Sequence, residues 1–200
     1  MAKLYFKYGA MGSSKSAQAL ITQFNYEELG MTVWLIKPSV DTRDGADVIR
    51  SRIGLERRAQ IITPEQDIVE AYHAAGQHDV IIADEAQFFT EEQIWQFREI
   101  ASLYDVTVIC YGLRTDFRCQ LFPGSKALFM LADDIDEIAS VCKCGRKTVV
   151  NARIGADGKV IVHGPQVEIG GNDKYESLCW TCWRKALRDN GVDELREIVG

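Results

Sequence analysis

An eight-residue loop, Gly9-Ala10-Met11-Gly12-Ser13-Ser14-Lys15-Ser16, sets the architecture that the rest of the chain follows. The apolar run Leu4–Tyr8 before it predicts a β-strand, and apolar residues at helical spacing from Ala17 to Phe24 predict an α-helix after it. Strand, glycine-bearing loop and helix in this order are typical of a P-loop, whose backbone N–H groups hold a polyphosphate. The lysine would reach the terminal phosphates, and the Ser16 hydroxyl would hold Mg²⁺. The alternative is an ordinary strand-to-helix turn.

Serine at position 14 departs from the P-loop pattern G-x-x-x-x-G-K-[ST], which has glycine there. Because serine carries a Cβ atom, it costs more than glycine wherever the backbone needs a positive φ or approaches a phosphate closely. We expect the loop to stay functional. Ser14 would then either alter the fit around the phosphates or weaken the affinity for them.

The composition is that of an ordinary globular protein. The 200 residues, 46% hydrophobic and 26% charged, suit one domain or one domain with a small appendage. With 23 basic and 29 acidic residues, the net charge is −6. An acidic chain disfavours a protein that holds duplex nucleic acid by neutralising its phosphates, so we expect no nucleic-acid partner.

The location of the protein is predicted to be cytoplasmic, without a membrane partner. No apolar run approaches the roughly 20 residues that span a bilayer. The first residues, Met1-Ala2-Lys3, enter a strand directly and lack the pattern of a signal peptide. In this compartment the six cysteines are interpreted as thiols or metal ligands rather than disulfides.

A second motif follows about seventy residues later, where the apolar run Val80–Ala83 ends in Asp84-Glu85. This pattern is typical of a Walker B strand, which carries an acidic residue to the edge of the sheet near Mg²⁺. Glu85, one residue further on, would point toward the space beyond the terminal phosphate. The alternative is a pair of acidic residues that only happen to end a strand.

Strands and helices alternate between and after these motifs. The predicted strands are 32–36, 80–83, 106–112 and 135–141; the predicted helices begin at capping-box patterns, Thr63 to Gln66 and Thr90 to Gln93. This alternation predicts an α/β fold with a mostly parallel sheet and ligands at the carboxyl ends of its strands. The P-loop, Asp84-Glu85 and the loop 113–118 would meet there. The arginine-rich stretch 41–58 is interpreted as a solvated loop, although its arginines could instead approach phosphates.

Two cysteine pairs, Cys142/Cys144 and Cys179/Cys182, are separated by 34 residues. Four thiolates can enclose one tetrahedral Zn²⁺, so these pairs predict a structural zinc site, with reduced free thiols as the alternative. The segment between them suggests hairpins and a long loop, which is typical of a lid. A final helix is predicted over 183–195. Cys110 and Cys119 are interpreted as small buried apolar residues.

Taken together, these motifs resemble those of type II thymidine kinases, the bacterial thymidine kinase family. The resemblance rests on Gly9 to Ser16, Asp41-Thr42-Arg43, Asp84 to Phe88, Tyr111 to Phe117, the paired cysteines and Gly170 to Tyr175. It covers nearly the whole chain, in order and without a large insertion.

The resemblance implies a fold, an activity and partners. The fold would be a RecA-like P-loop domain over residues 1–140, a zinc-binding lasso domain over 141–190 and a tail over 191–200. The activity would be transfer of the γ-phosphate of ATP, bound with Mg²⁺, to the 5′-hydroxyl of thymidine, giving dTMP for nucleoside salvage. The family further implies a homotetramer and feedback inhibition by dTTP.

The resemblance also implies a role for each matching residue. Glu85 would be the general base. The ATP site would comprise Gly9, Ala10, Met11, Gly12, Ser13, Ser14, Lys15, Ser16, Asp41, Thr42, Arg43, Asp84, Ala86 and Gln87, with Ser16 and Asp84 serving Mg²⁺. The nucleoside site would comprise Met11, Phe88, Leu113, Phe117, Phe122, Gln166, Val167, Glu168, Ile169, Gly170 and Tyr175. The zinc ligands would be Cys142, Cys144, Cys179 and Cys182.

Two other functions use the same motifs. Asp84-Glu85-Ala86-Gln87 also resembles the Walker B motif of helicases, although a helicase normally needs a second RecA-like domain and a basic track for the strand. A zinc-ribbon module with a vestigial P-loop is the second alternative, because Ser14 weakens the P-loop pattern.

Overall fold

A sheet of six parallel strands forms the centre of the computed structural model, which describes residues 2–41, 45, 47–167, 174–193 and 198. The strand order is β5-β2-β6-β7-β1-β8, and every neighbouring pair is parallel. The strands are β1 (Leu4–Tyr8), β2 (Val33–Pro38), β5 (Gln60–Ile62), β6 (Val80–Ala83), β7 (Thr107–Gly112) and β8 (Asp134–Glu137). This sheet confirms the predicted fold class.

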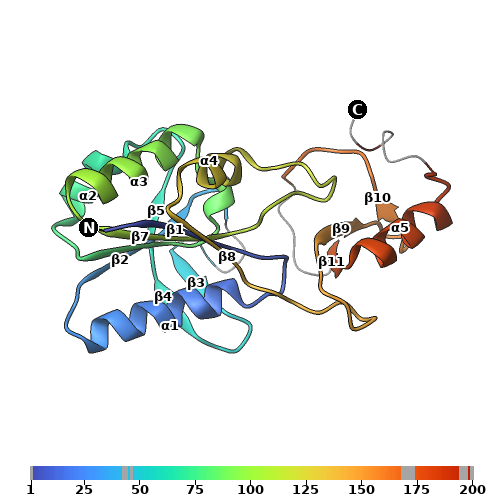
Figure 1. Ribbon diagram of the computed structural model, residues 1–200, viewed down its shortest axis with the longest axis horizontal. Helices are drawn as coiled ribbons and strands as arrows, with labels where there is room; N and C mark the ends of the chain where they lie inside the picture. The colour runs from blue at the N-terminus through green and yellow to red at the C-terminus, as the bar shows by residue number, and fades with distance from the viewer. Residues whose placement is uncertain (1, 42–44, 46, 168–173, 194–197, 199–200) are drawn as a thin grey trace.

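Helices cover both faces of this sheet (Figure 1). On one face lies α1 (Lys15–Glu28); on the other lie α2 (Ile68–Ala75), α3 (Glu91–Leu103) and α4 (Pro123–Leu131). Successive strand residues point to opposite faces, so Ile81 and Ala83 of β6 pack under α2–α4, while Val80 and Ile82 pack under α1. Because both faces are covered, all four residues of β6 are buried, and the strand has a continuous apolar sequence.

The arginine-rich stretch 41–58, interpreted above as a loop, contains a short hairpin. Its strands β3 (Val48–Arg50) and β4 (Glu56–Arg58) pair antiparallel, and Figure 1 shows them on the same side of the sheet as α1. Ile49 is buried with Leu20 of α1, whereas Arg57 and Arg58 are exposed. A hairpin that buries so few side chains leaves little apolar pattern in the sequence, which is why it was missed.

Helix starts were predicted with mixed success. At Thr90 the full capping box forms with Gln93, as predicted. At Thr63 the prediction was wrong: the Gln66 side chain accepts a hydrogen bond from the Thr63 N–H, but the next residues make a turn. The helix begins only after Asp67, whose carboxylate accepts the Glu70 N–H at 2.8 Å. The helix α4 was not predicted at all.

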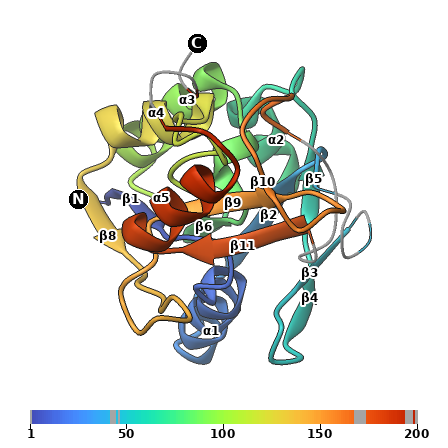
Figure 2. The same ribbon diagram turned by 90° about the vertical axis from the view of Figure 1, so that its right-hand side faces the viewer.

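Past β8, which ends earlier than the predicted strand 135–141, the chain forms a second, antiparallel sheet. Its order is β10-β9-β11, from β9 (Val150–Ile154), β10 (Val160–Ile161) and β11 (Tyr175–Leu178). The helix α5 (Trp180–Asp189) packs on it through Trp183 and Leu187, beginning and ending before the predicted helix 183–195. Figure 2 looks onto this small sheet, which lies beyond the carboxyl edge of the main one. The domain limits at 140 and 190 stay predictions.

The 3₁₀ turn η1 (Ala86–Phe88) lies directly under the start of α4. A Cβ atom on Gly124 would lie 2.6 Å from the Ala86 carbonyl oxygen and 2.7 Å from that of Phe89. These neighbours are backbone atoms that cannot rotate away.

Among the described residues, none of the helices has the length and apolar character needed to cross a membrane.

Replacing Gly124 with alanine is therefore expected to destabilise the protein. Helix propensity alone would favour alanine by about 1 kcal/mol, but the backbone clash should reverse the sign and cost about 2 kcal/mol. Chemical denaturation measures the difference, with Lys126→Ala on the exposed side of α4 as a control that stays within about 0.5 kcal/mol of wild type. A Gly124→Ala variant as stable as wild type would contradict the close packing of α4 on η1.

Candidate active site

The P-loop joins β1 to α1 at the carboxyl edge of the sheet. Ser14 lies in the left-handed region with φ 64°, the conformation in which serine costs more than glycine. The Lys15 side chain is buried and donates a hydrogen bond to the Ala10 carbonyl oxygen at 2.8 Å, which closes the loop on itself. The loop thus has the curvature of a phosphate cradle.

A cavity of about 900 Å³ opens in front of this loop. It is lined by Met11, Gly12, Ser14, Lys15, Ser16, Ala17, Arg50, Ser51, Arg52, Ile53, Glu85 and Leu113. The Arg52 guanidinium comes from the tip of the β3–β4 hairpin and lies against Gly12, 3.4 Å from the position a Cβ atom would take there. Arg50 and Arg52 therefore line the cavity in front of the P-loop. This position agrees with the alternative interpretation of stretch 41–58, in which its arginines approach phosphates.

Asp84 directly follows β6 and is buried next to Ser16, which lines this cavity. The Ser16 hydroxyl hydrogen-bonds to its carboxylate, yet its Oδ1 atom has no hydrogen-bond partner among the described residues. Burial, and then the neighbouring Glu85, raise the pKa of Asp84 to about 7. A buried carboxylate oxygen without a donor, next to a serine hydroxyl, suits a hard cation such as Mg²⁺, so the residues fit the metal that a P-loop kinase uses.

Glu85 follows in the left-handed conformation, with φ 50°. The Gln87 side-chain amide donates a hydrogen bond to its carboxylate at 2.6 Å and accepts one from the Leu113 N–H at 2.9 Å. Gln87 thus fixes the direction of the carboxylate. The resemblance assigned Ala86 and Gln87 to the ATP site. Both residues are buried, and neither lines the cavity in front of the P-loop.

A second cavity, of about 580 Å³, lies on the other side of Glu85. Its wall contains the predicted nucleoside residues Met11, Phe88, Leu113, Phe117, Phe122, Gln166, Val167 and Tyr175, together with Val40, Asp41, Glu85, Thr115, Asp116 and Asn151. The rings of Phe88 and Phe122 meet edge to face at 5.6 Å. The polar wall residues Thr115, Asp116 and Asn151 were missed; the first two lie in the loop already predicted to face the site, and Asn151 carried no signal.

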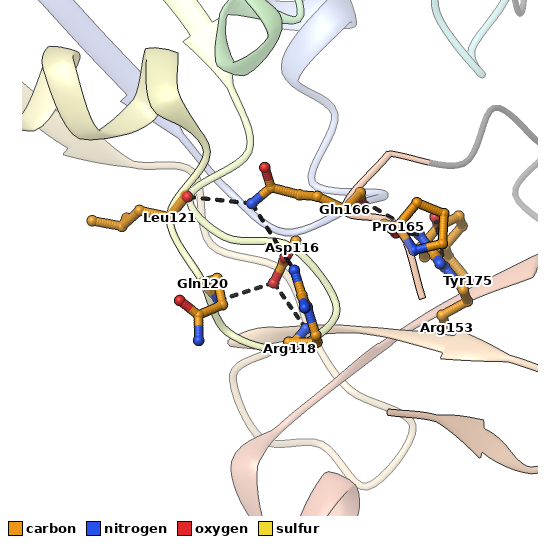
Figure 3. Close-up of polar contacts among 8 residues, drawn as sticks. All are labelled: Asp116, Arg118, Gln120, Leu121, Arg153, Pro165, Gln166 and Tyr175. Atoms are coloured by element: carbon orange, nitrogen blue, oxygen red, sulfur yellow. Dashed lines mark hydrogen bonds and ion pairs between the residues drawn. The ribbon is translucent and has the colours of Figure 1, made fainter. Parts of the chain in front are cut away.

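The segment after β10 reaches this cavity through Gln166 (Figure 3). The Gln166 side-chain amide donates to the Asp116 carboxylate at 3.2 Å and to the Leu121 carbonyl oxygen at 3.3 Å. Asp116 also accepts the backbone N–H groups of Arg118 and Gln120. Glu168, Ile169 and Gly170, assigned to the nucleoside site by resemblance, lie outside the described residues.

Asp41 lies three residues beyond the end of β2, and its backbone N–H donates to the Pro38 carbonyl oxygen. Its carboxylate pairs with the buried Lys37 ammonium at 3.2 Å, and Lys37 also donates to the Val48 carbonyl oxygen at the base of the hairpin. Asp41 lines the second cavity and not the one in front of the P-loop. Thr42 and Arg43, predicted with it for the ATP site, lie outside the described residues.

The four predicted zinc ligands come together between the small sheet and α5. Every pair of their sulfur atoms lies within 4.8 Å, and Cys144 and Cys179 are 3.5 Å apart. A tetrahedral site with Zn–S bonds of about 2.3 Å needs sulfur atoms about 3.8 Å apart, so the cluster fits zinc. Backbone N–H groups at Cys144 and Cys179 lower the pKa of Cys142 to about 6, whereas hydrogen bonds with the Cys144 and Cys179 thiols raise the pKa of Cys182 to about 12.

Glu85, Met11 and Leu113 line both cavities, so the phosphate side and the apolar side meet at one carboxylate. A polyphosphate in the first cavity and a hydroxyl-bearing acceptor in the second could react across this junction. The fold and this junction together place the protein among the P-loop kinases.

Comparison with known proteins narrows this class. A family model described as thymidine kinase matches residues 2–183. The thymidine kinase of Ruegeria pomeroyi is 44% identical over 195 residues, which cover 96% of this chain and 98% of the relative. That of Enterobacteria phage T4 is 44% identical over 194 residues, covering 96% and 100%. The chain belongs to the thymidine kinase family, as its motifs had indicated.

Replacing Ser14 with glycine is expected to stabilise the protein. A Cβ atom on a residue in the left-handed conformation costs about 1 kcal/mol, and the exchange removes that cost. Denaturation should show a gain of that order, and the KM for ATP should stay within about threefold of wild type if serine only alters the fit. A loss of stability would mean that the Ser14 side chain makes a compensating interaction.

Replacing Cys179 with serine is expected to abolish zinc binding, because three thiolates and a hydroxyl no longer form the four-sulfur site. Elemental analysis should find about one zinc per wild-type chain and little in the variant. Cys119→Ser is the matched control, since Cys119 is half-buried nearby but stands outside the cluster. Equal zinc contents in Cys179→Ser and wild type would contradict the assignment.

Proposed function

We propose that the protein transfers the γ-phosphate of ATP to the 5′-hydroxyl of thymidine, forming dTMP. The observation that carries this proposal is the junction at Glu85, where a phosphate-binding cavity and an apolar cavity share one carboxylate. Family membership supports thymidine and ATP as the substrates over the helicase-like and zinc-ribbon alternatives.

The P-loop and the hairpin would hold the triphosphate. Backbone N–H groups of residue 12 and residues 14–16, the Lys15 ammonium and the Arg52 guanidinium would face the first cavity and offset phosphate charge. Ser16 and Asp84 would hold Mg²⁺. When bound, Mg²⁺ neutralises charge on the phosphates while the γ-phosphoryl group is transferred. The protein's own contribution to this step is positioning and electrostatic stabilisation.

The nucleoside would lie in the second cavity with its 5′-hydroxyl toward Glu85. Phe88, Phe117 and Phe122 supply flat apolar surface for the base. Glu85 would accept the hydroxyl proton as the oxygen attacks phosphorus, and Gln87 would keep its carboxylate aimed at that point. The long loop that carries Gln166, Val167 and Tyr175 would then exclude water, which competes as an acceptor.

Zinc, location, assembly and regulation complete the proposal. Four cysteines would hold a structural Zn²⁺ that fixes both ends of the lid. Family resemblance supports a cytoplasmic homotetramer that dTTP inhibits. Light scattering after size-exclusion chromatography tests the tetramer, and a rate measurement with added dTTP tests the inhibition.

Exchanging Glu85 for glutamine tests the base. Glutamine keeps the shape and can still accept the Gln87 hydrogen bond, but it cannot take a proton. We expect kcat to fall by at least about a hundredfold, while an ATP analogue still binds. Glu92→Gln, at an exposed position of α3, is the matched control and should turn over normally.

Two results would contradict this proposal. Near-normal turnover by Glu85→Gln would remove Glu85 as the base. No dTMP from zinc-loaded wild-type protein with ATP, Mg²⁺ and thymidine would refute the kinase activity itself.

A further inference from the structure

One face of the small sheet carries two cross-strand pairs that point at the active site. In the register of β9 and β11, Asn151 lies opposite Ser177, and Arg153 lies opposite Tyr175. Residues two apart on a strand share a face, so the two pairs are neighbours on it. Both Asn151 and Arg153 are buried, at 4% and 2% exposure, so their polar groups must find partners inside the protein.

The first pair holds the phosphate-binding loop. The Asn151 side-chain oxygen accepts the Met11 N–H at 2.7 Å, and the Ser177 hydroxyl donates to the Met11 carbonyl oxygen at 2.5 Å. The Asn151 side-chain N–H group also donates to the Thr115 carbonyl oxygen at 3.1 Å. Both backbone polar groups of Met11, a residue that lines both cavities, are therefore fixed from the small sheet.

The second pair holds the lid and the wall of the apolar cavity. The Arg153 guanidinium donates to the Tyr175 hydroxyl at 3.0 Å and to the Pro165 carbonyl oxygen at 3.1 Å, as Figure 3 shows. It also lies over the Phe117 ring, 3.9 Å from its centroid. Arg153 thus connects Pro165 and Tyr175 to the wall of the cavity in which the nucleoside would bind.

We propose that Asn151 and Ser177 are positioning residues for the P-loop, and that the small sheet couples nucleoside binding to ATP binding. A nucleoside that packs against Phe117, over which Arg153 lies, would stabilise the Arg153–Tyr175 pair. Because the other pair lies two residues along the same strands, it would also stabilise the Met11 backbone in its phosphate-binding position. Coupling of this kind is reciprocal, so each substrate should bind more tightly when the other is present.

Asparagine suits this position because it offers an acceptor and a donor at once. Leucine has a similar size but would leave the Met11 N–H and the Thr115 carbonyl oxygen without these partners. Each orphaned buried polar group destabilises the folded protein, and part of that cost falls on folding while the rest falls on ATP binding. The same reasoning makes Ser177→Ala a milder change, since it removes a single hydrogen bond.

The test is calorimetric binding of a non-hydrolysable ATP analogue to zinc-loaded, full-length protein, with and without thymidine. We expect thymidine to tighten analogue binding to wild type several-fold. Asn151→Leu should weaken it about tenfold and Ser177→Ala about threefold, without loss of zinc. Arg153→Met should lose the tightening that thymidine gives wild type. Glu176→Gln, on the opposite face of β11, is the matched control and should behave as wild type.

This proposal rests on the proposed function. Failure of the proposal can be told apart from failure of the kinase activity, because binding of the analogue needs no turnover. If Asn151→Leu does not fold, Ser177→Ala decides the positioning role. Analogue affinity and ATP KM unchanged in Ser177→Ala, and in Asn151→Leu where it folds, would overturn that role. Analogue binding that thymidine does not change in wild type would overturn the coupling, whereas absence of dTMP formation would refute the kinase activity instead.

Discussion

The active site depends on a backbone constraint at the end of β6. The strand is buried on both faces, so its polar continuation can begin only where the sheet ends, and there the chain turns through the left-handed conformation of Glu85. That turn directs Asp84 and Glu85 to different surroundings: Asp84 lies buried beside Ser16, and Glu85 lies between the two cavities. A left-handed non-glycine residue costs roughly 1–2 kcal/mol, and such strain is found most often at functional sites.

The helix α4 supports the turn that follows Glu85. Gln87 can reach both Glu85 and the Leu113 N–H because η1 is a tight turn, and η1 is held tight by the start of α4. The Ser125 hydroxyl of that helix in turn donates to the Leu113 carbonyl oxygen at 2.6 Å. A glycine at position 124 is thus connected, through two short steps, to the direction of the proposed catalytic carboxylate.

The sequence was most informative where apolar periodicity and a motif coincide. The strand at Leu4–Tyr8, the P-loop helix, the strand before Asp84 and the capping box at Thr90 were predictable because each has a local physical cause. The hairpin that brings Arg52 to Gly12 was not, since Ile49 is nearly its only buried side chain. Asn151 could not be found either: its role exists only because residues 140 positions apart meet.

The cysteine cluster has a consequence for the entropy of the chain. Joining the two pairs closes a loop of 34 residues between Cys144 and Cys179, and a covalent cross-link of that length removes about 4 kcal/mol of unfolded-state entropy on the chain-entropy model. The small three-stranded sheet with its one helix has a smaller apolar core than the six-stranded sheet, so a term of this size would be a substantial part of its stability. A zinc ion held by the four cysteines would therefore add order to a unit with a small core, whereas the six-stranded sheet beside it owes its order to packing.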